Sequence, residues 1–133
     1  MKAGLRILSS EYESTDIYYQ PGTEELVIDR SNSSAASTTT PGVSTNQEQG
    51  KLRLFNIASG NGTSTVERLD LTIIVDNSIV EVYANDRFVL STWVWSWYDE
   101  STQISFLQEG STDVQFGNVT VYEGLVDAWP QRP

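Results

Sequence analysis

The sequence predicts an all-β protein, an antiparallel β-sandwich of two stacked sheets with about ten short strands. Three observations lead to this prediction. Apolar and polar residues alternate with a period of two in short runs along most of the chain. Turn-forming pairs such as Pro21-Gly22 and Asn61-Gly62 separate these runs at short intervals. No window shows the apolar spacing of an amphipathic helix.

The first part of the chain contains three expected strands, at residues 4–8, 15–20 and 24–30, with Pro21-Gly22 as the turn between the last two. Residues 31–50, SNSSAASTTTPGVSTNQEQG, are rich in Ser and Thr and nearly lack large apolar side chains. Such a segment cannot bury enough apolar surface to order itself, so we expect an exposed, mobile loop. A further strand is expected at residues 51–57.

The run LDLTIIVDNSIVEVYANDRFVLSTWVW is the most regularly patterned part of the chain, and it predicts strands at residues 66–75, 79–84 and 87–95. Asn77-Ser78 and Asn85-Asp86 suit the two tight turns because Asn accepts a positive φ. This pattern predicts a three-stranded meander with one buried face, made of Leu69, Leu71, Ile73, Val75, Val80, Val82, Ala84, Phe88, Leu90, Thr92 and Val94.

The last part of the chain predicts strands at residues 102–107, 113–116 and 118–122, separated by Gly110 and Gly117-Asn118. With 133 residues and no internal repeat, the chain is expected to form a single domain, residues 1–133. The start, MKAGLRILSS, lacks the apolar run of a signal peptide and enters a strand almost at once. We therefore expect that the natural chain begins further upstream.

Composition narrows the possible functions. The net charge of −10 repels phosphate backbones and anionic lipids, which disfavours nucleic-acid and membrane-surface partners but leaves neutral sugars unaffected. The chain has no histidine and no cysteine, which excludes Ser-His-Asp triads, thiol nucleophiles, disulfides and thiolate or imidazole zinc sites. We expect no metal and no cofactor, and only carboxylate chemistry remains open.

The candidate acids for such chemistry are Asp70, Asp76 and Glu81, which are expected on the outer face of one hairpin. Glycoside hydrolysis needs two carboxyl groups roughly 5 to 10 Å apart, on either side of the scissile bond. Solvated surface acids are much commoner than such pairs, so we expect no catalysis from this chain. For Glu81 we expect a structural role, an ion pair across strands with Arg53, Arg68 or Arg87.

Three tripeptides fit the N-glycosylation pattern, at Asn32, Asn61 and Asn118. Two of them lie in expected loops. Together they favour a secreted protein with glycans, and they predict added hexose at Asn32 and Asn61 on material from a eukaryotic secretory host.

The segment VDNSIVEVYANDRFVLST, residues 75–92, resembles a signature in the C-terminal β-sandwich of family 32 glycoside hydrolases, the invertases, inulinases and related fructosyl-processing enzymes. TDIYYQPGTEELVIDRSNSS is similar to an early hairpin of the same domain, and FGNVTVYEGLVDAWPQRP is similar to the closing strand and tail of fungal members. The resemblance runs from about Gly4 to Pro133. It implies two stacked antiparallel sheets beside a catalytic five-bladed propeller.

The resemblance also implies where catalysis takes place in this family, namely in propeller motifs that contain Asp-Pro pairs and a Glu-Cys pair. This chain has no cysteine, and none of its four prolines follows an aspartate, because they follow Gln20, Thr40, Trp129 and Arg132. The family mechanism is therefore not expected here.

WVWSWY, residues 93–98, places Trp93, Trp95 and Trp97 on the outward face of its strand. Family members commonly have Arg and Tyr in place of Trp93 and Trp95, and Pro in place of Ser96. Three interpretations remain open. The stripe packs within this chain, for instance against Trp129, or it faces the propeller, since exposed apolar patches mark contact surfaces, or it is a carbohydrate-binding platform, since flat aromatic faces suit sugar rings.

Two functions follow from these observations. The first is a non-catalytic sandwich module with a structural and interface role, whose partner is a catalytic propeller or another protomer. The alternative is a self-standing module that binds β-fructan or sucrose. A large apolar patch on the outward surface favours the first function, whereas a polar groove beside one or two Trp favours the second.

Overall fold

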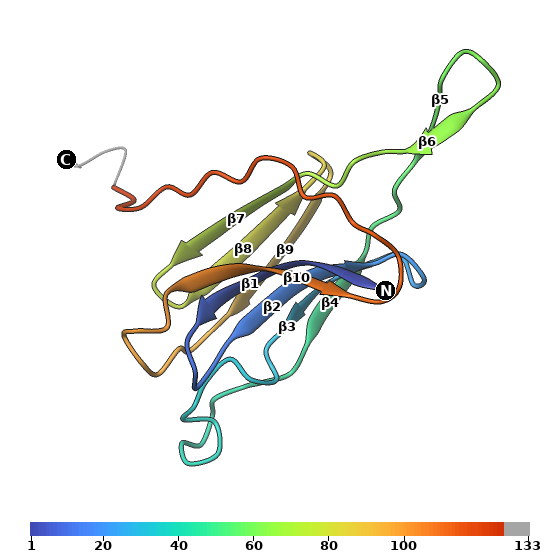
Figure 1. Cartoon of the computed structure of the whole chain (residues 1–133). Helices are drawn as coiled ribbons and strands as arrows, with labels where there is room; N and C mark the ends of the chain where they lie inside the picture. Colours follow the sequence, from blue (N-terminus) through green and yellow to red (C-terminus); the bar gives the residue numbers. More distant parts are fainter. Residues whose placement is uncertain (127–133) are drawn as a thin grey trace.

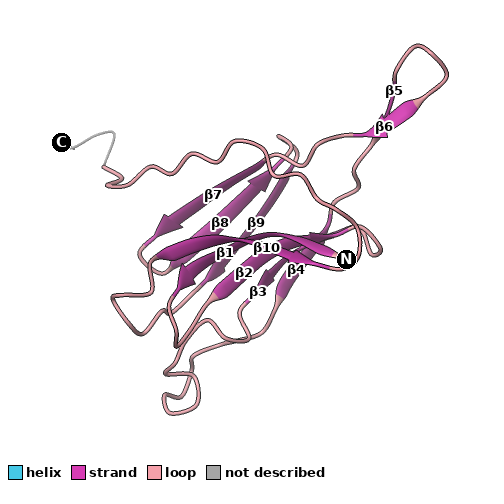
Figure 2. Cartoon of the chain, viewed as in Figure 1, coloured by secondary structure: helices cyan, strands magenta, loops and turns pink. Residues whose placement is uncertain are grey.

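A computed structural model of the chain describes residues 1–126 and is built of strands and connecting loops (Figure 1, Figure 2). None of these residues forms a helix that could span a membrane. The strands in this part of the chain are β1 (Lys2–Ser9), β2 (Thr15–Gln20), β3 (Glu25–Asp29), β4 (Glu48–Lys51), β5 (Asn56–Ala58), β6 (Ser64–Val66), β7 (Leu71–Asp76), β8 (Ile79–Ala84), β9 (Phe88–Trp93) and β10 (Gln103–Glu109).

The strands form a sandwich, which confirms the predicted fold class. A five-stranded sheet in the order β10-β1-β2-β3-β4 lies under a three-stranded sheet in the order β7-β8-β9, and β5 and β6 form a separate hairpin. All strand pairs are antiparallel. In Figure 1 the β5–β6 hairpin projects away from both sheets.

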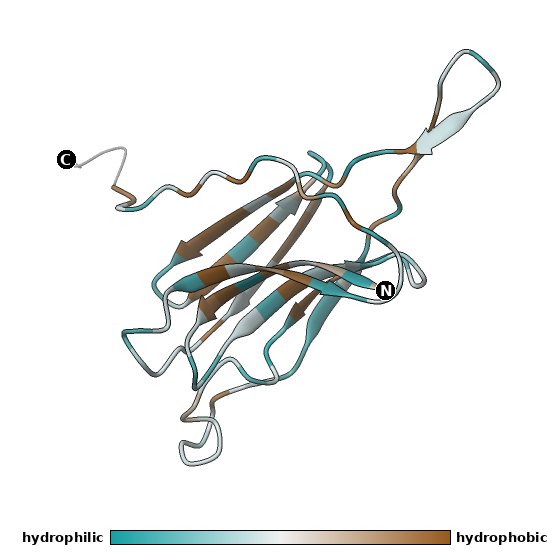
Figure 3. Cartoon of the chain, viewed as in Figure 1, coloured by the Kyte–Doolittle hydropathy of each residue, from teal (hydrophilic) through white to brown (hydrophobic). Residues whose placement is uncertain are grey.

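The core lies between the two sheets and follows from the period-two pattern of the strands. Val80 and Val82 of β8 are 0% exposed, as are Ile17 of β2 and Ile28 of β3. Figure 3 shows hydrophobic residues alternating with polar ones along β8. Because successive side chains of a strand point to opposite faces, this alternation buries one row of β8, whereas in β2 and β3 the other row is buried as well at Tyr18 and Val27.

The two turns of the meander form as expected. Asn77 has a φ of 55° and Asn85 a φ of 50°, both in the left-handed region that Asn tolerates. The Asn85 side chain adds a clamp, because its Oδ1 accepts from the backbone N of Asp70 at 2.7 Å and its Nδ2 donates to the carbonyl oxygen of Arg68 at 3.0 Å. The side chain therefore ties the second turn to the start of β7.

Several strand predictions are wrong in their limits. The strand expected at residues 51–57 ends at Lys51, because the Leu52 amide turns to the carbonyl oxygen of Glu24 at 2.8 Å. The strand expected at residues 66–75 is split into β6 and β7. Residues 113–116 and 118–122 form no strand, although they alternate, because alternation yields a strand only where a partner backbone lies in register.

The start of the Ser- and Thr-rich segment also differs from the exposed loop that we expected. Ser33, Ser34 and Ala36 are buried, whereas residues 38–42 are exposed. Two backbone hydrogen bonds position the buried part, from Ser14 to Asn32 and from Ser33 to Arg30. Tertiary contacts that composition does not encode therefore order residues 31–36.

The two lateral edges of the sandwich differ. At the closed edge β4 lies against β9, so tightly that a Cβ at Gly50 would come within 2.8 Å of the Phe88 ring. Three strands then cover only part of a five-stranded sheet, and the uncovered part is at β10, which we call the open edge. The cross-strand row from Ile28 through Ile17 and Leu5 to Phe106 begins in the core and ends with Phe106 at 55% exposure.

Candidate functional site

A solvent-accessible groove lined by two tryptophans lies at the closed edge, where β4 and β9 meet. Its walls come from the ends of β3 and β9, the start of β4 and the loop before β4. The groove has a volume of about 420 Å³, within the range of roughly 300–1,000 Å³ that is common for small-molecule sites. Its lining residues are Arg30, Gly42, Ser44, Glu48, Thr92, Trp93 and Trp95.

Trp93 and Trp95 form the aromatic wall of this groove. Their ring centroids are 6.0 Å apart and their planes differ by only 15°, so the two indoles are nearly parallel. Trp93 is 55% exposed and Trp95 is 48% exposed, which leaves about half of each side chain in contact with solvent. Outward-pointing tryptophans were expected from the register, and packing of these two side chains into the described part of the chain is not observed. Trp129 lies outside the described residues.

Arg30 forms the floor of the groove and is almost fully buried. Its guanidinium donates to the carbonyl oxygens of Asn46 at 2.7 Å and Trp93 at 2.9 Å. It also donates to Ser44 Oγ at 3.3 Å and to Glu48 Oε1 at 2.9 Å. Because these partners use four of its five N–H groups, Arg30 joins β3, β4 and β9 and offers little free positive charge to a ligand.

Glu13 lies in the loop between β1 and β2, and its almost fully buried side chain anchors the segment that follows β9. Its carboxylate accepts hydrogen bonds from the backbone amides of Trp97 and Tyr98, each at 2.9 Å, and of Ala35 at 2.8 Å. The Ser101 hydroxyl donates to it at 2.6 Å. A buried charge is tolerated only with such partners, so Glu13 fixes three loops to one another.

These hydrogen bonds also set the ionisation of Glu13. Burial by itself would raise the pKa of this carboxyl group, but donation from Ser101 and from the amides of Tyr98, Ala35 and Trp97 outweighs it. The net result is a pKa lowered from the ordinary value of 4.5. Glu13 therefore stays ionised in the folded protein, and its charge is satisfied by the hydrogen bonds that hold the segment carrying the tryptophans.

Trp97 stands apart from the other two tryptophans. It is more exposed than either of them, but it does not line the groove. Its backbone is held by Glu13, while the neighbouring Tyr98 ring packs on Tyr12 with centroids 4.7 Å apart. The structure thus brings together two of the three tryptophans that the sequence singled out, and adds polar residues from β3 and β4.

The expected ion pair of Glu81 with an arginine is wrong. The three candidates have other partners: Arg53 pairs with Glu24, Arg68 with Asp70 and Arg87 with Glu67. Glu81 instead accepts a weak hydrogen bond from the hydroxyl of Tyr83 at 3.4 Å. Within residues 1–126 no three His, Cys, Asp or Glu side chains cluster in a way that could hold a metal ion.

The three predicted glycosylation sites lie on the surface. Asn32 and Asn118 are exposed, and Asn61 lies at the tip of the β5–β6 hairpin. There the Thr63 hydroxyl donates to Asn61 Oδ1 at 2.6 Å, so the asparagine and threonine of this tripeptide face each other. Accessibility is compatible with modification, and glycosylation of these residues stays a prediction.

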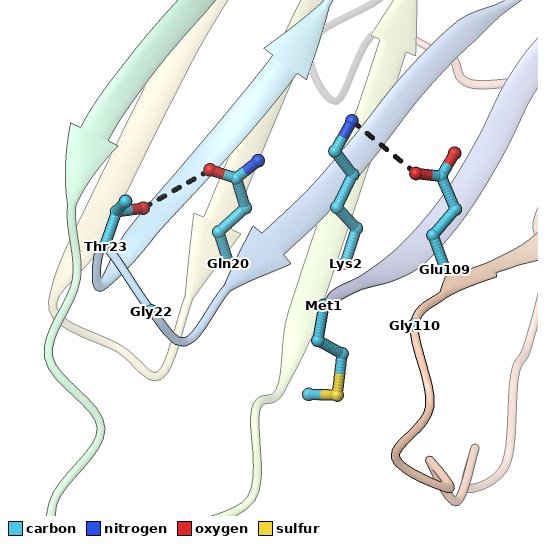
Figure 4. A pocket seen from close by; sticks show the side chains of 7 residues that line it. All are labelled: Met1, Lys2, Gln20, Gly22, Thr23, Glu109 and Gly110. Carbon is cyan, nitrogen blue, oxygen red and sulfur yellow. Dashed lines mark hydrogen bonds and ion pairs between the residues drawn. The ribbon is translucent and has the colours of Figure 1, made fainter.

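A second hollow, of about 430 Å³, lies at the other end of the five-stranded sheet (Figure 4). Its polar side chains pair among themselves, with Lys2 Nζ 3.7 Å from Glu109 and the Thr23 hydroxyl 3.3 Å from Gln20 Oε1. No aromatic ring lines it. It therefore lacks the combination of a flat apolar surface and free polar atoms found at the tryptophan groove.

Sequence reasoning missed Arg30, Glu48 and Glu13. Arg30 and Glu48 are separated by 18 residues, and Glu13 lies 84 residues from Trp97. The sequence placed Arg30 only within the hairpin segment TDIYYQPGTEELVIDRSNSS and assigned it no role. No local pattern predicts that these side chains meet, because the contacts form only when the two sheets stack.

The comparison with protein-family models and the comparison with solved structures lead to the same family. Residues 1–123 match the family model described as glycosyl hydrolases family 32 C terminal. Two similar solved structures are a fructosyltransferase from A. japonicus and a beta-fructofuranosidase from Aspergillus kawachii in complex with glycerol, each 59% identical with a TM-score of 0.75. Each match covers 79% of this chain, but only 16% and 17% of the respective neighbour. The search of curated proteins found no match.

Proposed function

The chain belongs to the family of C-terminal domains of family 32 glycosyl hydrolases, and we propose that it is a non-catalytic structural and interface module of a longer fructosyl-processing enzyme. The neighbours are a fructosyltransferase and a beta-fructofuranosidase, and this chain spans about a sixth of their length. In this proposal the catalytic groups lie in the remaining part of such an enzyme, and this module packs against that part.

The observation that carries the proposal is the uncovered inner side of β10. Phe106 pairs with Leu5 and shares the row of Ile17, so its side chain points to the same face as the core. Ile104 lies on that face two residues earlier, yet Ile104 is 47% and Phe106 55% exposed. Apolar side chains on the buried face of a sheet that remain in water mark a surface for another polypeptide.

The segment after β10 extends this surface. The Phe116 ring packs on Phe106 with centroids 4.3 Å apart and covers it only in part. The residues that follow add further exposed apolar side chains, namely Val119, Val121, Tyr122, Leu125 and Val126. In Figure 1 this segment runs past β7 without joining a sheet. We assign the resulting patch, from Ile104 to Val126, to contact with the rest of the enzyme chain.

The inner side chains of β7 support the same assignment. Leu71, Ile73 and Val75 are only partly buried, whereas Val80 and Val82 of the adjacent β8 are fully buried. Phe88 and Leu90 of β9 are also only partly buried, but β9 contacts β4 at the closed edge. The missing cover lies beside β7 and above β10, which favours a partner that docks on this edge rather than on the tryptophan stripe.

The experiment is an exchange of modules in a complete enzyme. The corresponding C-terminal part of the A. japonicus fructosyltransferase is replaced by this chain, and thermal unfolding is followed by calorimetry. We expect one cooperative transition, because docked modules unfold together. Phe106→Asp should split or lower that transition, since it places a charge in the proposed interface.

Val89→Asp is the matched control for this experiment. Val89 is 56% exposed, close to the 55% of Phe106, but lies on the outer face of β9. We expect this variant to leave the single transition unchanged. Equal effects of the two substitutions, or an effect of Val89→Asp alone, would contradict docking through the open edge. A dimer of the isolated chain that Phe106→Asp dissociates would identify a second copy as the partner instead.

We further propose that the enzyme acts outside the cell as a glycoprotein. The support is the presence of three exposed asparagines in the glycosylation pattern, one of them at the tip of a projecting hairpin. The intact mass of the chain from a eukaryotic secretory host checks this proposal. A mass increase that Asn61→Gln reduces by one glycan is expected, and an unmodified mass would refute it.

A further inference from the structure

We propose that the Trp93–Trp95 groove binds one ring of a neutral sugar, with the indoles as a stacking platform and Glu48, Ser44 and Thr92 as hydrogen-bonding partners. This goes beyond the interface role, and it concerns the opposite edge of the sandwich. The five-stranded sheet has β4 at one edge and β10 at the other. A partner docked on β10 therefore leaves the groove beside β4 free.

The aromatic wall has the shape that a sugar ring needs. The two indoles are nearly parallel, and about half of each is exposed. They stack on each other and both line the groove, so their exposed parts give it an apolar aromatic wall. The C–H face of a sugar ring is flat and weakly apolar, so it stacks on such a surface and displaces water.

The polar atoms of the groove match the hydroxyl groups of a sugar. Glu48 uses its Oε1 for Arg30, and no donor among residues 1–126 reaches its Oε2, while the side chain is 44% exposed. Ser44 accepts from Arg30 through its oxygen, so its own hydroxyl hydrogen is available. The Thr92 hydroxyl adds a group that both donates and accepts.

The charges in and around the groove exclude an anionic ligand. Four of the five N–H groups of Arg30 are occupied by Asn46, Trp93, Ser44 and Glu48. The free oxygen of Glu48 and the net charge of −10 repel phosphates and carboxylates. A neutral ligand rich in hydroxyl groups meets neither obstacle.

The platform is also held in place before a ligand arrives. Arg30 bonds to the carbonyl oxygen of Trp93, and the amide of Val94 donates to the carbonyl oxygen of Ser78 at 2.7 Å. Glu13 holds the amide of Trp97 on the other side of Trp95. These hydrogen bonds fix the backbone before and after Trp95 in the free protein. Less conformational entropy is therefore lost when a sugar ring binds.

The test is a titration of the full 133-residue chain, followed by tryptophan fluorescence and by calorimetry. The probes are a short inulin oligomer, a cellulose oligomer and a starch oligomer, all neutral. We expect saturable binding of at least one of them, and the arm that binds identifies the sugar. Trp95→Ala should weaken it about tenfold, at the upper end of the energies typical of aromatic contacts, and Trp95→Phe should retain most of it.

Trp97→Ala is the matched control, because Trp97 is an exposed tryptophan of the same segment outside the groove. We expect an unchanged affinity for this variant and a loss for Glu48→Gln, with circular dichroism showing that each variant is folded. Absence of saturation with all three oligomers would overturn the proposal, and so would equal losses in Trp95→Ala and Trp97→Ala. Neither result affects the module exchange at the open edge, so the two proposals fail separately.

Discussion

The closed edge of the sandwich, at β4 and β9, and the open edge, at β7 and β10, differ in how far the chain itself satisfies their side chains. At the closed edge buried Arg30 has four of its five N–H groups paired within the chain, and buried Glu13 holds the segment that follows β9. At the open edge Ile104 and Phe106 point to the core face and remain half exposed. The buried polar groups of one edge are satisfied by the chain itself, whereas the other edge has core-facing apolar side chains that only a partner can cover.

This difference shows how two functions fit on one small sandwich. An edge closed by charge-assisted hydrogen bonds is rigid, so it can present Trp93 and Trp95 in a fixed arrangement. An edge left open retains the driving force of the hydrophobic effect for association. Stability should therefore be concentrated at the closed edge and in the core, and substitutions at the open edge should affect association instead.

The largest loss of stability is expected from a substitution in the buried part of the cross-strand row that runs from Ile28 to Phe106. Ile17→Ala removes a side chain that is 0% exposed, and leaves a cavity between the sheets. We expect a loss of about 3 kcal/mol in the free energy of unfolding, as for other buried Ile. Urea unfolding at a constant m value measures it. A loss near zero would mean that the core is not packed as described.

The next largest effect on stability is expected at Glu13, which anchors the segment that follows β9. Glu13→Gln keeps the size of the side chain but replaces one acceptor oxygen with an NH₂ group, which faces backbone amides. We expect a loss of about 2–3 kcal/mol, since hydrogen bonds to a charged group are replaced by an unsatisfied arrangement. Chemical denaturation measures the loss, with Glu11→Gln, at an exposed neighbouring residue, as the control.

The contribution of Glu13 should also depend on pH. Its pKa is lowered in the folded protein from an ordinary value of 4.5, so the unfolded chain binds the proton more tightly. The stabilisation is therefore complete above the unfolded pKa and is lost as the pH falls through the folded pKa. The difference between the native chain and Glu13→Gln should begin to shrink as the pH falls towards the ordinary value of 4.5, and it should continue to shrink below it. A constant difference would contradict an ionised Glu13.

The smallest effect on stability is expected at Phe106, the exposed end of the same cross-strand row. Phe106→Ala removes a large side chain that is already 55% exposed, so we expect a loss below about 1 kcal/mol in the isolated chain. The comparison with Ile17→Ala sharpens the contrast, because both residues lie in one cross-strand row. Equal losses from the two substitutions would show that the open edge is closed in solution, for example by the residues after β10.

Features that depend on interactions between neighbouring residues could be predicted from the sequence, whereas features that depend on contacts between distant residues could not. The meander was predicted closely, with β8 at its observed limits, because alternation and Asn turns are local signals. The outward direction of Trp93 and Trp95 followed from the same register. The groove could not be predicted, because it forms only when β3 and β4 meet β9. The strand expected at residues 118–122 does not form, because the alternating pattern does not specify a neighbouring strand with which it could pair.

The most direct test of the central claim is hydrogen exchange, measured by mass spectrometry on the isolated chain and on the same chain exchanged into the A. japonicus fructosyltransferase. The account predicts that residues 103–122 and the edge amides of β7 exchange quickly in the isolated chain and become protected in the complete enzyme. Residues 93–101 should exchange equally in both. Protection that instead appears on the outer face around Val89 and Trp93, with β10 unchanged, would contradict docking through the open edge.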